Sequence, residues 1–287
     1  MAIKIKQLTH IYNPNTPFEK IALEDINIEI NDGEFIGIIG HTGSGKSTLI
    51  QMFNGLIKPT SGEVFIKGQN IHASDVDKKR IRQQVGLVFQ YPEHQLFEMT
   101  VYEDVAFGPK NMGLSENEIR DRVDYALKAV GMSEEYYEKS PFELSGGQKR
   151  RVAIAGVLAM KPDILILDEP TAGLDPKGRD ALFNQLKKMH EELGLTIVLI
   201  SHSMEDVAKY AEKLIVLYQG KIAYQAATRE VFAKGKELEA IGLAMPQIRY
   251  IVESLKARGM SISTDVLTVE EAASIIKDYL RKGGDFQ

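Results

Sequence analysis

Two segments near the N-terminus alternate apolar and polar residues, as half-buried strands do. The apolar positions are Ile3, Ile5 and Leu8 in the first segment and Ile26, Ile28 and Ile30 in the second. Between them lies NPNTP at 13–17, which is rich in turn-forming residues. The pattern therefore predicts two antiparallel strands joined across a turn-rich connection.

Three later segments are apolar throughout, which is typical of strands buried on both faces of a parallel sheet. They are EFIGIIG at 34–40, DILILDE at 163–169 and TIVLISH at 196–202. The first ends in glycine and is followed by helical periodicity from Ser47 to Leu56. The order strand, glycine loop, helix is the start of an α/β unit, whose ligands bind at the carboxyl ends of the strands.

Helical patterns dominate from Glu93 to about Ala159, where Ile119, Val123 and Leu127 recur at helical spacing. We interpret 93–159 as a helical subdomain inserted into an α/β domain of residues 1–241.

Residues 242–287 are expected to form a small helical appendix. An apolar stripe of Ile248, Ile251, Val252 and Leu255 precedes a break at Gly259. A second helix should then begin at a capping box of Thr268 and Glu271. Its apolar face comprises Ala272, Ile276 and Leu280.

Composition excludes several classes of protein. A chain of 287 residues that is 44% hydrophobic can bury a full core, so disordered and fibrous classes are excluded. Its 35 basic and 40 acidic residues are interleaved, and no single-sign field favours nucleic acid as a ligand. The absence of cysteine excludes disulfides and thiolate metal sites. No secretory leader or bilayer-spanning stretch is evident, so we expect the chain to stay in the cytosol.

The segment GHTGSGKST at 40–48 fits the phosphate-binding pattern G-x-x-x-x-G-K-[ST] between a predicted strand and a predicted helix. Its backbone N–H groups should surround a phosphate, while Lys46 reaches the β- and γ-phosphates and Ser47 ligates Mg²⁺. The alternative is a glycine turn that binds nothing. The predicted ATP-binding residues here are Gly40, Thr42, Gly43, Ser44, Gly45, Lys46, Ser47 and Thr48.

Two adjacent acids end the second buried strand. Asp168 is expected to hold Mg²⁺, and Glu169 to act as general base or to position water at the γ-phosphate. The alternative is that both acids cap the following loop.

The segment LSGGQ at 144–148 opens a predicted amphipathic helix. Alone, it could be an ordinary helix start with Ser145 as N-cap. Between a phosphate loop and a strand ending in Asp-Glu, however, it makes the sequence resemble the ABC ATPases over nearly its whole length. The resemblance implies an α/β P-loop NTPase fold of ABC type with a mixed sheet, an antiparallel β subdomain and the inserted helices.

By this resemblance Ser145, Gly146 and Gly147 bind the γ-phosphate of an ATP held by another subunit, and Gln148 belongs to the same set. A helix N-terminus with glycines presents bare N–H groups to an anion, which agrees with that role. The resemblance therefore implies a nucleotide site completed by a second subunit.

Four further positions match the family. Gln90 resembles the glutamine that senses Mg²⁺ and links the nucleotide to the helical subdomain, although a solvated strand end is an equal alternative. Asp175, in an otherwise ordinary turn, resembles the loop that joins the two sites. His202 resembles the histidine at the γ-phosphate, against the alternative of a structural histidine. Tyr12 resembles the aromatic residue that stacks on adenine, although edge-strand tyrosines are common.

The segment QYPEHQLFEMTVYEDVAFGPKN at 90–111 and the appendix resemble the energy-coupling factor group, importers of vitamins and of cobalt or nickel ions. QYPEHQLF together with GHTGSGKST resembles the second of its two related ATPases. The implied partners are a second ATPase, identical or homologous, a transmembrane coupling protein and a small substrate-binding membrane protein. The subunit would be peripheral, at the cytoplasmic face of the cell membrane. A docking groove is expected near 91–107, where Phe97, Val101 and Phe107 could equally be internal core.

Three other functions share parts of this pattern. Translation ATPases of the same fold normally carry two such domains and a basic linker, and chromosome or repair ATPases carry very long coiled coils; neither feature is present. Exporters and binding-protein-dependent importers would have the same ATP site. Only the 90–111 segment and the appendix argue against these other transporters.

Overall fold

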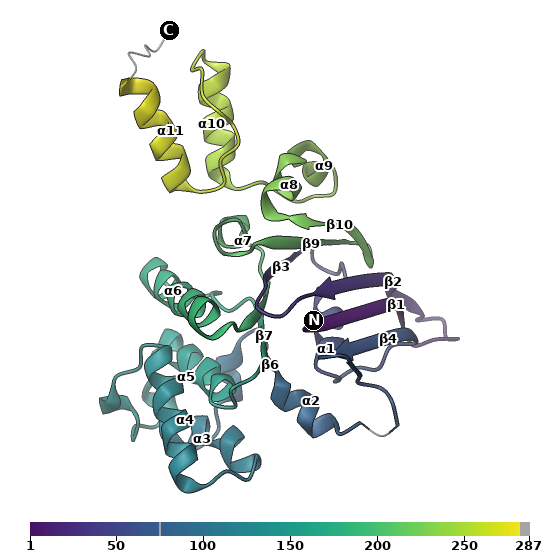
Figure 1. Ribbon diagram of the computed structural model, residues 1–287, viewed down its shortest axis with the longest axis vertical. Helices are drawn as coiled ribbons and strands as arrows, with labels where there is room; N and C mark the ends of the chain where they lie inside the picture. The colour runs from purple at the N-terminus through teal and green to yellow at the C-terminus, as the bar shows by residue number, and fades with distance from the viewer. Residues whose placement is uncertain (75, 282–287) are drawn as a thin grey trace.

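The computed structural model describes residues 1–74 and 76–281, whose strands form two sheets (Figure 1). The antiparallel sheet has the order β2-β1-β4-β5, and the larger sheet has the order β10-β9-β3-β8-β7-β6. The strands of the first are β1 (Ile3–Tyr12), β2 (Lys20–Ile30), β4 (Ser61–Ile66) and β5 (Gln69–Asn70). Those of the second are β3 (Phe35–Ile39), β6 (Val85–Val88), β7 (Ile164–Asp168), β8 (Thr196–Ile200), β9 (Lys213–Tyr218) and β10 (Lys221–Ala227).

The larger sheet is mixed. Strands β6, β7, β8, β3 and β9 pair in parallel, and β10 joins β9 in the antiparallel direction. Leu165 and Leu167 of β7 pack into one hydrophobic core, while Ile164 and Ile166 pack into the other. This strand is buried on both faces, which explains why its sequence is apolar without alternation.

The antiparallel strands pair in the register that their alternation predicts. Ile3 lies opposite Ile30, Ile5 opposite Ile28 and Leu8 opposite Ile26. All six are buried, and they pack in one core with α1 and one face of the larger sheet. The N-terminal hairpin is therefore tied to the strand that leads into the phosphate loop.

Helices connect the strands and also form the two ends of the molecule. The α-helices are α1 (Lys46–Phe53), α2 (Lys78–Gln84), α3 (Val101–Asn111), α4 (Glu116–Ala129), α5 (Gly146–Leu158), α6 (Pro176–Leu193), α7 (Met204–Tyr210), α8 (Thr228–Ala233), α9 (Gly235–Ala240), α10 (Gln247–Ala257) and α11 (Val269–Arg281). Short 3₁₀ turns are η1 (Pro92–Gln95), η2 (Glu134–Tyr136) and η3 (Pro141–Glu143). Helix α1 ends earlier than the expected Leu56, because Gly55 adopts a positive φ of 68°.

Helices α3, α4 and α5 gather at one end of the molecule, and α10 and α11 lie at the other (Figure 1). The expected Ile119, Val123 and Leu127 of α4 are buried in the core that also covers one face of the larger sheet. We propose on this basis that 93–159 is an inserted subdomain of the 1–241 domain.

The C-terminal helices have a small core of their own, formed by Val252, Met260, Ile262, Val266 and Ala272. We therefore propose a separate C-terminal unit from residue 242 onward; residues 282–287 of the predicted appendix lie outside the described residues. Two positions of the predicted apolar faces, Ile251 and Leu280, are instead about half exposed, at 54% and 48%.

The capping box expected at α11 forms only in part. The Thr268 hydroxyl accepts from the Glu271 N–H (3.2 Å), but the Glu271 carboxylate accepts from the Leu267 N–H (2.8 Å) and binds Arg229.

No helix in the described part of the chain has the length and apolar character needed to cross a bilayer.

Candidate functional site

A cavity of about 310 Å³ lies at the carboxyl ends of the central strands, beside the start of α1. Two positions that sequence reasoning missed, Lys20 and Ala22, also line it. The predicted residues that line this cavity are Tyr12, Thr42, Gly43, Gly45, Lys46, Ser47, Thr48, Gln90, Asp168, Glu169 and His202. The structure therefore brings together residues that lie up to 190 positions apart in the sequence, from Tyr12 to His202.

The glycine loop of residues 40–45 has a backbone that requires glycine at its end. Gly45 has a φ of 106°, and a Cβ there would lie 2.7 Å from the carbonyl oxygen of Ala22. Helix α1 begins at the next residue, so its first N–H groups have no intrahelical partner and its positive dipole end faces the cavity. This arrangement suits a bound phosphate.

Two predicted members of the loop do not line the cavity. Gly40 lies against the Leu217 carbonyl, and a Cβ there would come within 2.4 Å of that oxygen. Ser44 is fully buried beneath the loop, and its N–H donates to the His41 carbonyl (3.1 Å). Both residues therefore shape the loop from behind.

Lys46 is only 7% exposed, and its Nζ donates to the carbonyl oxygens of Gly40 (2.6 Å) and His41 (3.1 Å). Burial lowers the pKa of Lys46, and the carboxylates of Glu169 and Asp168 oppose that shift. A cation is thus held at the mouth of the loop, close to two acids.

Asp168 is the last residue of β7, and burial raises the pKa of its carboxyl. Glu169 follows with a φ of 52°, a left-handed conformation that is uncommon for a residue with a side chain. Such strain, where the surrounding structure maintains it, is typical of functional sites.

The Glu169 side chain is 14% exposed, and its Oε1 has no hydrogen-bond partner among the residues that the structure describes. Burial raises the pKa of Glu169 to about 7. A carboxyl group that titrates near neutral pH can accept a proton efficiently, as a general base must.

His202 follows β8 and places its Nε2 3.8 Å from Oε1 of Glu169. Burial lowers the pKa of the imidazole, and the charge of Lys46 lowers it further. The histidine and the glutamate therefore face the same part of the cavity, opposite the phosphate loop.

Tyr12 is 38% exposed at the end of β1, and its hydroxyl lies 3.2 Å from the Thr48 hydroxyl of α1. Lys20 pairs with Tyr12 across the hairpin. Strand pairing across the NPNTP turn could have indicated Lys20, but register shifts between Ile5 and Ile11 make the count ambiguous from sequence.

The LSGGQ residues do not line this cavity, and neither does Asp175. Ser145 is the N-cap of α5 in a full capping box: its hydroxyl accepts from the Gln148 N–H (3.3 Å), and Gln148 Oε1 accepts from the Ser145 N–H (2.9 Å). The N-cap alternative is therefore observed. Ser145 and Gly146 are nevertheless exposed, and the N–H groups of Gly146 and Gly147 remain available to an anion, because the cap occupies only the Gln148 N–H of this turn.

Asp175 is the N-cap of α6, where its Oδ1 accepts from the Gly178 N–H (2.6 Å). Its exposed position leaves it outside its own chain's nucleotide cavity.

Comparison with known proteins decides the family. A family model described as ABC transporter matches residues 23–172. A protein named energy-coupling factor transporter ATP-binding protein EcfA2, from Caldanaerobacter subterraneus subsp. tengcongensis, is 57% identical over 281 residues, which are 98% of each chain. The chain belongs to the ABC transporter family. The protein of the same name from Clostridium acetobutylicum is 58% identical over 282 residues, again 98% of each chain.

Solved structures of ABC proteins support the same family assignment. The chain superimposes on cbiO1 from Clostridium perfringens, described as part of the ABC transporter complex cbiONQ, with a TM-score of 0.75 and 43% identity over 88% of this chain and 98% of that one. The chain also superimposes on the dimeric ATP-binding cassette MJ0796 bound to ADP and Pi. The TM-score is 0.71 and the sequence identity is 35%, over 79% of this chain and 98% of that one. The ABC-type fold and the resemblance to the energy-coupling factor ATPases, both expected from the sequence, are confirmed.

Proposed function

We propose that this chain is the ATP-binding and ATP-hydrolysing subunit of an energy-coupling factor importer, which powers uptake of a vitamin or of cobalt or nickel ions. The observation that carries this proposal is the convergence of Lys46, Glu169 and His202 on one cavity at the end of a phosphate loop. The near full-length similarity to energy-coupling factor ATP-binding proteins supports the type of importer.

The donor set in the cavity fits Mg²⁺. The Ser47 hydroxyl, the Gln90 amide and the Asp168 carboxylate line the same space, and all three offer the oxygen ligands that this ion prefers. Among the described residues, no group of three or more histidine or acidic side chains is arranged to hold a metal ion without other ligands. This agrees with Mg²⁺, which usually takes one or two carboxylates and completes its shell with phosphate oxygens and water. Bound there, the ion would neutralise charge on the β- and γ-phosphates.

Hydrolysis needs a base opposite the phosphate loop. In the proposed reaction Glu169 accepts a proton from water, the water oxygen bonds to the γ-phosphorus, and the bond from that phosphorus to ADP breaks. Lys46 and His202 stabilise the charge on the transferring group. Tyr12 stacks on the adenine at the other end of the cavity.

The site is completed by a second ATPase subunit. Because Ser145, Gly146 and Gly147 do not reach their own cavity, we propose that they contact the γ-phosphate held by the partner, with Gln148 and Asp175 beside it. The dimeric form of MJ0796 with ADP and Pi, at 35% identity, supports this arrangement. An isolated monomer is therefore expected to hydrolyse ATP poorly.

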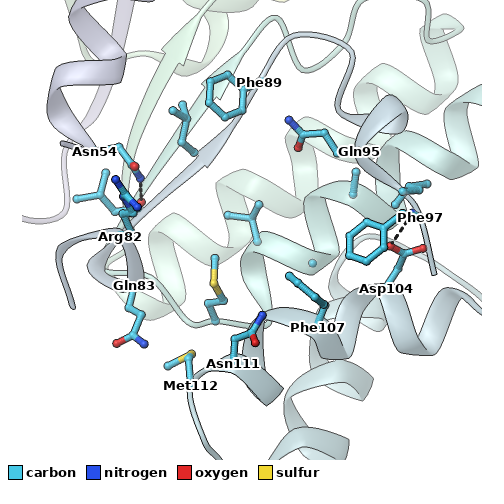
Figure 2. Close-up of a pocket in the computed structure, with 18 of the residues that line it drawn as sticks. Asn54, Arg82, Gln83, Phe89, Gln95, Phe97, Asp104, Phe107, Asn111 and Met112 are labelled. Atoms are coloured by element: carbon cyan, nitrogen blue, oxygen red, sulfur yellow. Dashed lines mark hydrogen bonds between the residues drawn. The ribbon is translucent and has the colours of Figure 1, made fainter. Parts of the chain in front are cut away.

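A larger groove of about 680 Å³ lies between α2, β6, α3 and α5 (Figure 2). Phe97 and Phe107 line it with their rings 5.0 Å apart, whereas Val101 is fully buried as internal core. Asp104, 9% exposed, accepts from the N–H groups of Phe97 and Glu98 at 3.2 Å and so holds the groove wall.

We propose that this groove receives a cytosolic helix of the transmembrane coupling protein, which in turn carries a small substrate-binding membrane protein. Its apolar floor and its polar rim of Arg82, Gln83, Gln95 and Asn111 suit an amphipathic helix. The chain would then be peripheral, at the cytoplasmic face of the cell membrane.

The proposal is tested by mild-detergent affinity purification of this chain from its own cells, with mass spectrometry of the proteins that accompany it. A sister ATPase or a second copy, a helical membrane scaffold and several small membrane proteins are expected. Recovery of one large permease pair would reject the energy-coupling factor type. Recovery of ribosomes or DNA-bound proteins would overturn the transport function itself.

A further inference from the structure

A buried ion pair joins the segment after Gln90 to the helix that follows LSGGQ. The Arg150 guanidinium donates to both carboxylate oxygens of Glu93: Nη2 lies 2.7 Å from Oε1 and 3.0 Å from Oε2, and Nε lies 3.1 Å from Oε2. Arg150 is only 3% exposed, and the Glu93 side chain is 17% exposed. The Tyr91 ring lies 6.0 Å from the guanidinium carbon. This contact is bidentate and largely shielded from water.

The pair stands where three functional segments meet. Glu93 lies in η1, three residues after Gln90, which lines the nucleotide cavity. The same turn leads directly to Gln95 and Phe97 in the wall of the docking groove. Arg150 lies in α5, one turn after Gly146 and two residues after Gln148, the last residue of LSGGQ.

Its neighbours on α5 make no equivalent contact. Lys149 lies over the Phe142 ring at 5.8 Å, and Arg151 has a buried Nε without a hydrogen-bond partner in the described residues. Arg150 is therefore the basic residue of this turn that ties α5 to η1.

We propose that Glu93 and Arg150 are positioning residues that hold the LSGGQ helix at a fixed orientation to the Gln90 segment. Nucleotide and Mg²⁺ at one subunit's own cavity act on Gln90, and the pair transmits that change to the LSGGQ residues that serve the other subunit's nucleotide. The two ATP sites then respond to each other, and the groove beside η1 responds with them. This inference rests on the proposed function.

The physical reason lies in the geometry of the contact. A planar guanidinium that makes two parallel hydrogen bonds to a carboxylate fixes both distance and angle, which a single lysine ammonium cannot do. Loss of either partner leaves a buried charge unpaired, so breaking the contact is costly and η1 and α5 are held in one relative orientation. Small misplacements of a group that contacts the transferring phosphate can reduce turnover about 100-fold.

The test uses the complete transporter purified with its membrane partners. The variants are Glu93→Gln, Arg150→Met, Arg150→Lys and the Glu93→Gln/Arg150→Met double variant. Arg122→Met is the matched control, because Arg122 also lies in the helical subdomain and donates to a backbone carbonyl of Met160 (3.0 Å) away from η1. Four quantities are measured: the nucleotide dissociation constant, kcat, the Hill coefficient of turnover against ATP concentration, and Tm.

Each single charge-removing variant should lower kcat about 10- to 100-fold and bring the Hill coefficient toward one. Its nucleotide affinity should change by less than about twofold, since the phosphate loop is intact. The double variant should be no worse than the more damaged single variant, as coupled residues are non-additive. Arg150→Lys should recover only part of kcat, and the Arg122→Met control should keep both kcat and the Hill coefficient.

Two outcomes would overturn the inference. One is a normal kcat and Hill coefficient in Glu93→Gln. The other is an equal loss of kcat in Arg122→Met, with Tm lowered as far as in the Glu93 and Arg150 variants, which would make subdomain stability the cause. The proposed function is tested separately in the same complex. The wild type should turn over ATP, and Glu169→Gln should abolish that turnover. A failure of the ion-pair inference is thereby distinguished from a failure of the ATPase assignment.

Discussion

Replacing Glu169 by glutamine should stabilise the nucleotide-free protein at alkaline pH while it nearly abolishes ATP turnover. Glutamine keeps the shape of the side chain but cannot ionise or accept a proton from water. Loss of a positioned general base typically lowers turnover about 10²- to 10⁴-fold. ATP binding should be retained, so the variant should accumulate a nucleotide-bound dimer.

The stability effect follows from the raised pKa. Burial raises the pKa of Glu169 from 4.5 to about 7, so the folded protein binds this proton more tightly than the unfolded chain does. The stabilisation from the protonated carboxyl is complete below pH 4.5 and is lost as the pH rises through 7. Between pH 5.5 and 8.5 the free energy of unfolding of the wild type should therefore fall by about 2 kcal/mol, whereas that of the glutamine variant should not show this fall.

The neighbouring groups do not reverse this sign. The pKa of about 7 already includes the charges beside Glu169, because burial and Asp168 raise it while Lys46 lowers it.

The assay is chemical and thermal unfolding of both proteins at pH 5.5 and 8.5 without nucleotide, with ATP turnover measured at the higher pH. A difference of about 2 kcal/mol corresponds to about 3 °C in Tm for a chain of this size. Glu191→Gln is the control, because Glu191 is 60% exposed on α6 and forms a surface ion pair with Lys187. The control should show no pH-dependent gain.

Two results would refute this reasoning. An unchanged stability difference between the two pH values would mean that burial does not hold the Glu169 proton. Rapid turnover by the glutamine variant would remove Glu169 from its role as base.

Three further substitutions test separate parts of the structure. Lys46→Ala should lose nucleotide affinity in an equilibrium titration, and unchanged binding would reject the phosphate loop. Gly146→Asp has open space for its side chain and should stabilise the start of α5 by about 0.3–1 kcal/mol, yet it should abolish turnover by repelling the partner-held γ-phosphate; normal turnover with normal Tm would contradict that contact. Met260→Ala should destabilise the C-terminal helices by about 2 kcal/mol or more and leave ATP affinity unchanged, because its core is separate; weakened ATP binding would show that the two units are coupled.

Local patterns were enough to predict most of the fold. The alternation of Ile3, Ile5 and Ile28 predicted strand pairing, because each strand has one buried face and the register is thereby determined. The continuous apolar character of β7 likewise predicted burial between two cores.

Positions that depend on tertiary neighbours could not be predicted. Ile251 is apolar at helical spacing yet exposed, because periodicity identifies a face and not what covers it. Lys20 reaches the nucleotide cavity only through a hairpin register with several irregularities. The Glu93–Arg150 pair joins residues 57 positions apart, and neither residue shows a local signal of its partner.

The central claim is that each nucleotide is held by one subunit and contacted by the LSGGQ residues of another. Vanadate replaces the γ-phosphate after hydrolysis, and under ultraviolet light it cleaves the backbone that touches it. The decisive measurement is vanadate cleavage of the purified complex that carries Lys46→Ala in this chain only, with fragments identified by mass spectrometry. The account predicts that cleavage at this chain's own phosphate loop is lost, while cleavage near Ser145 persists together with cleavage of the partner's phosphate loop. Loss of cleavage near Ser145 while the partner's loop is still cleaved would contradict the account.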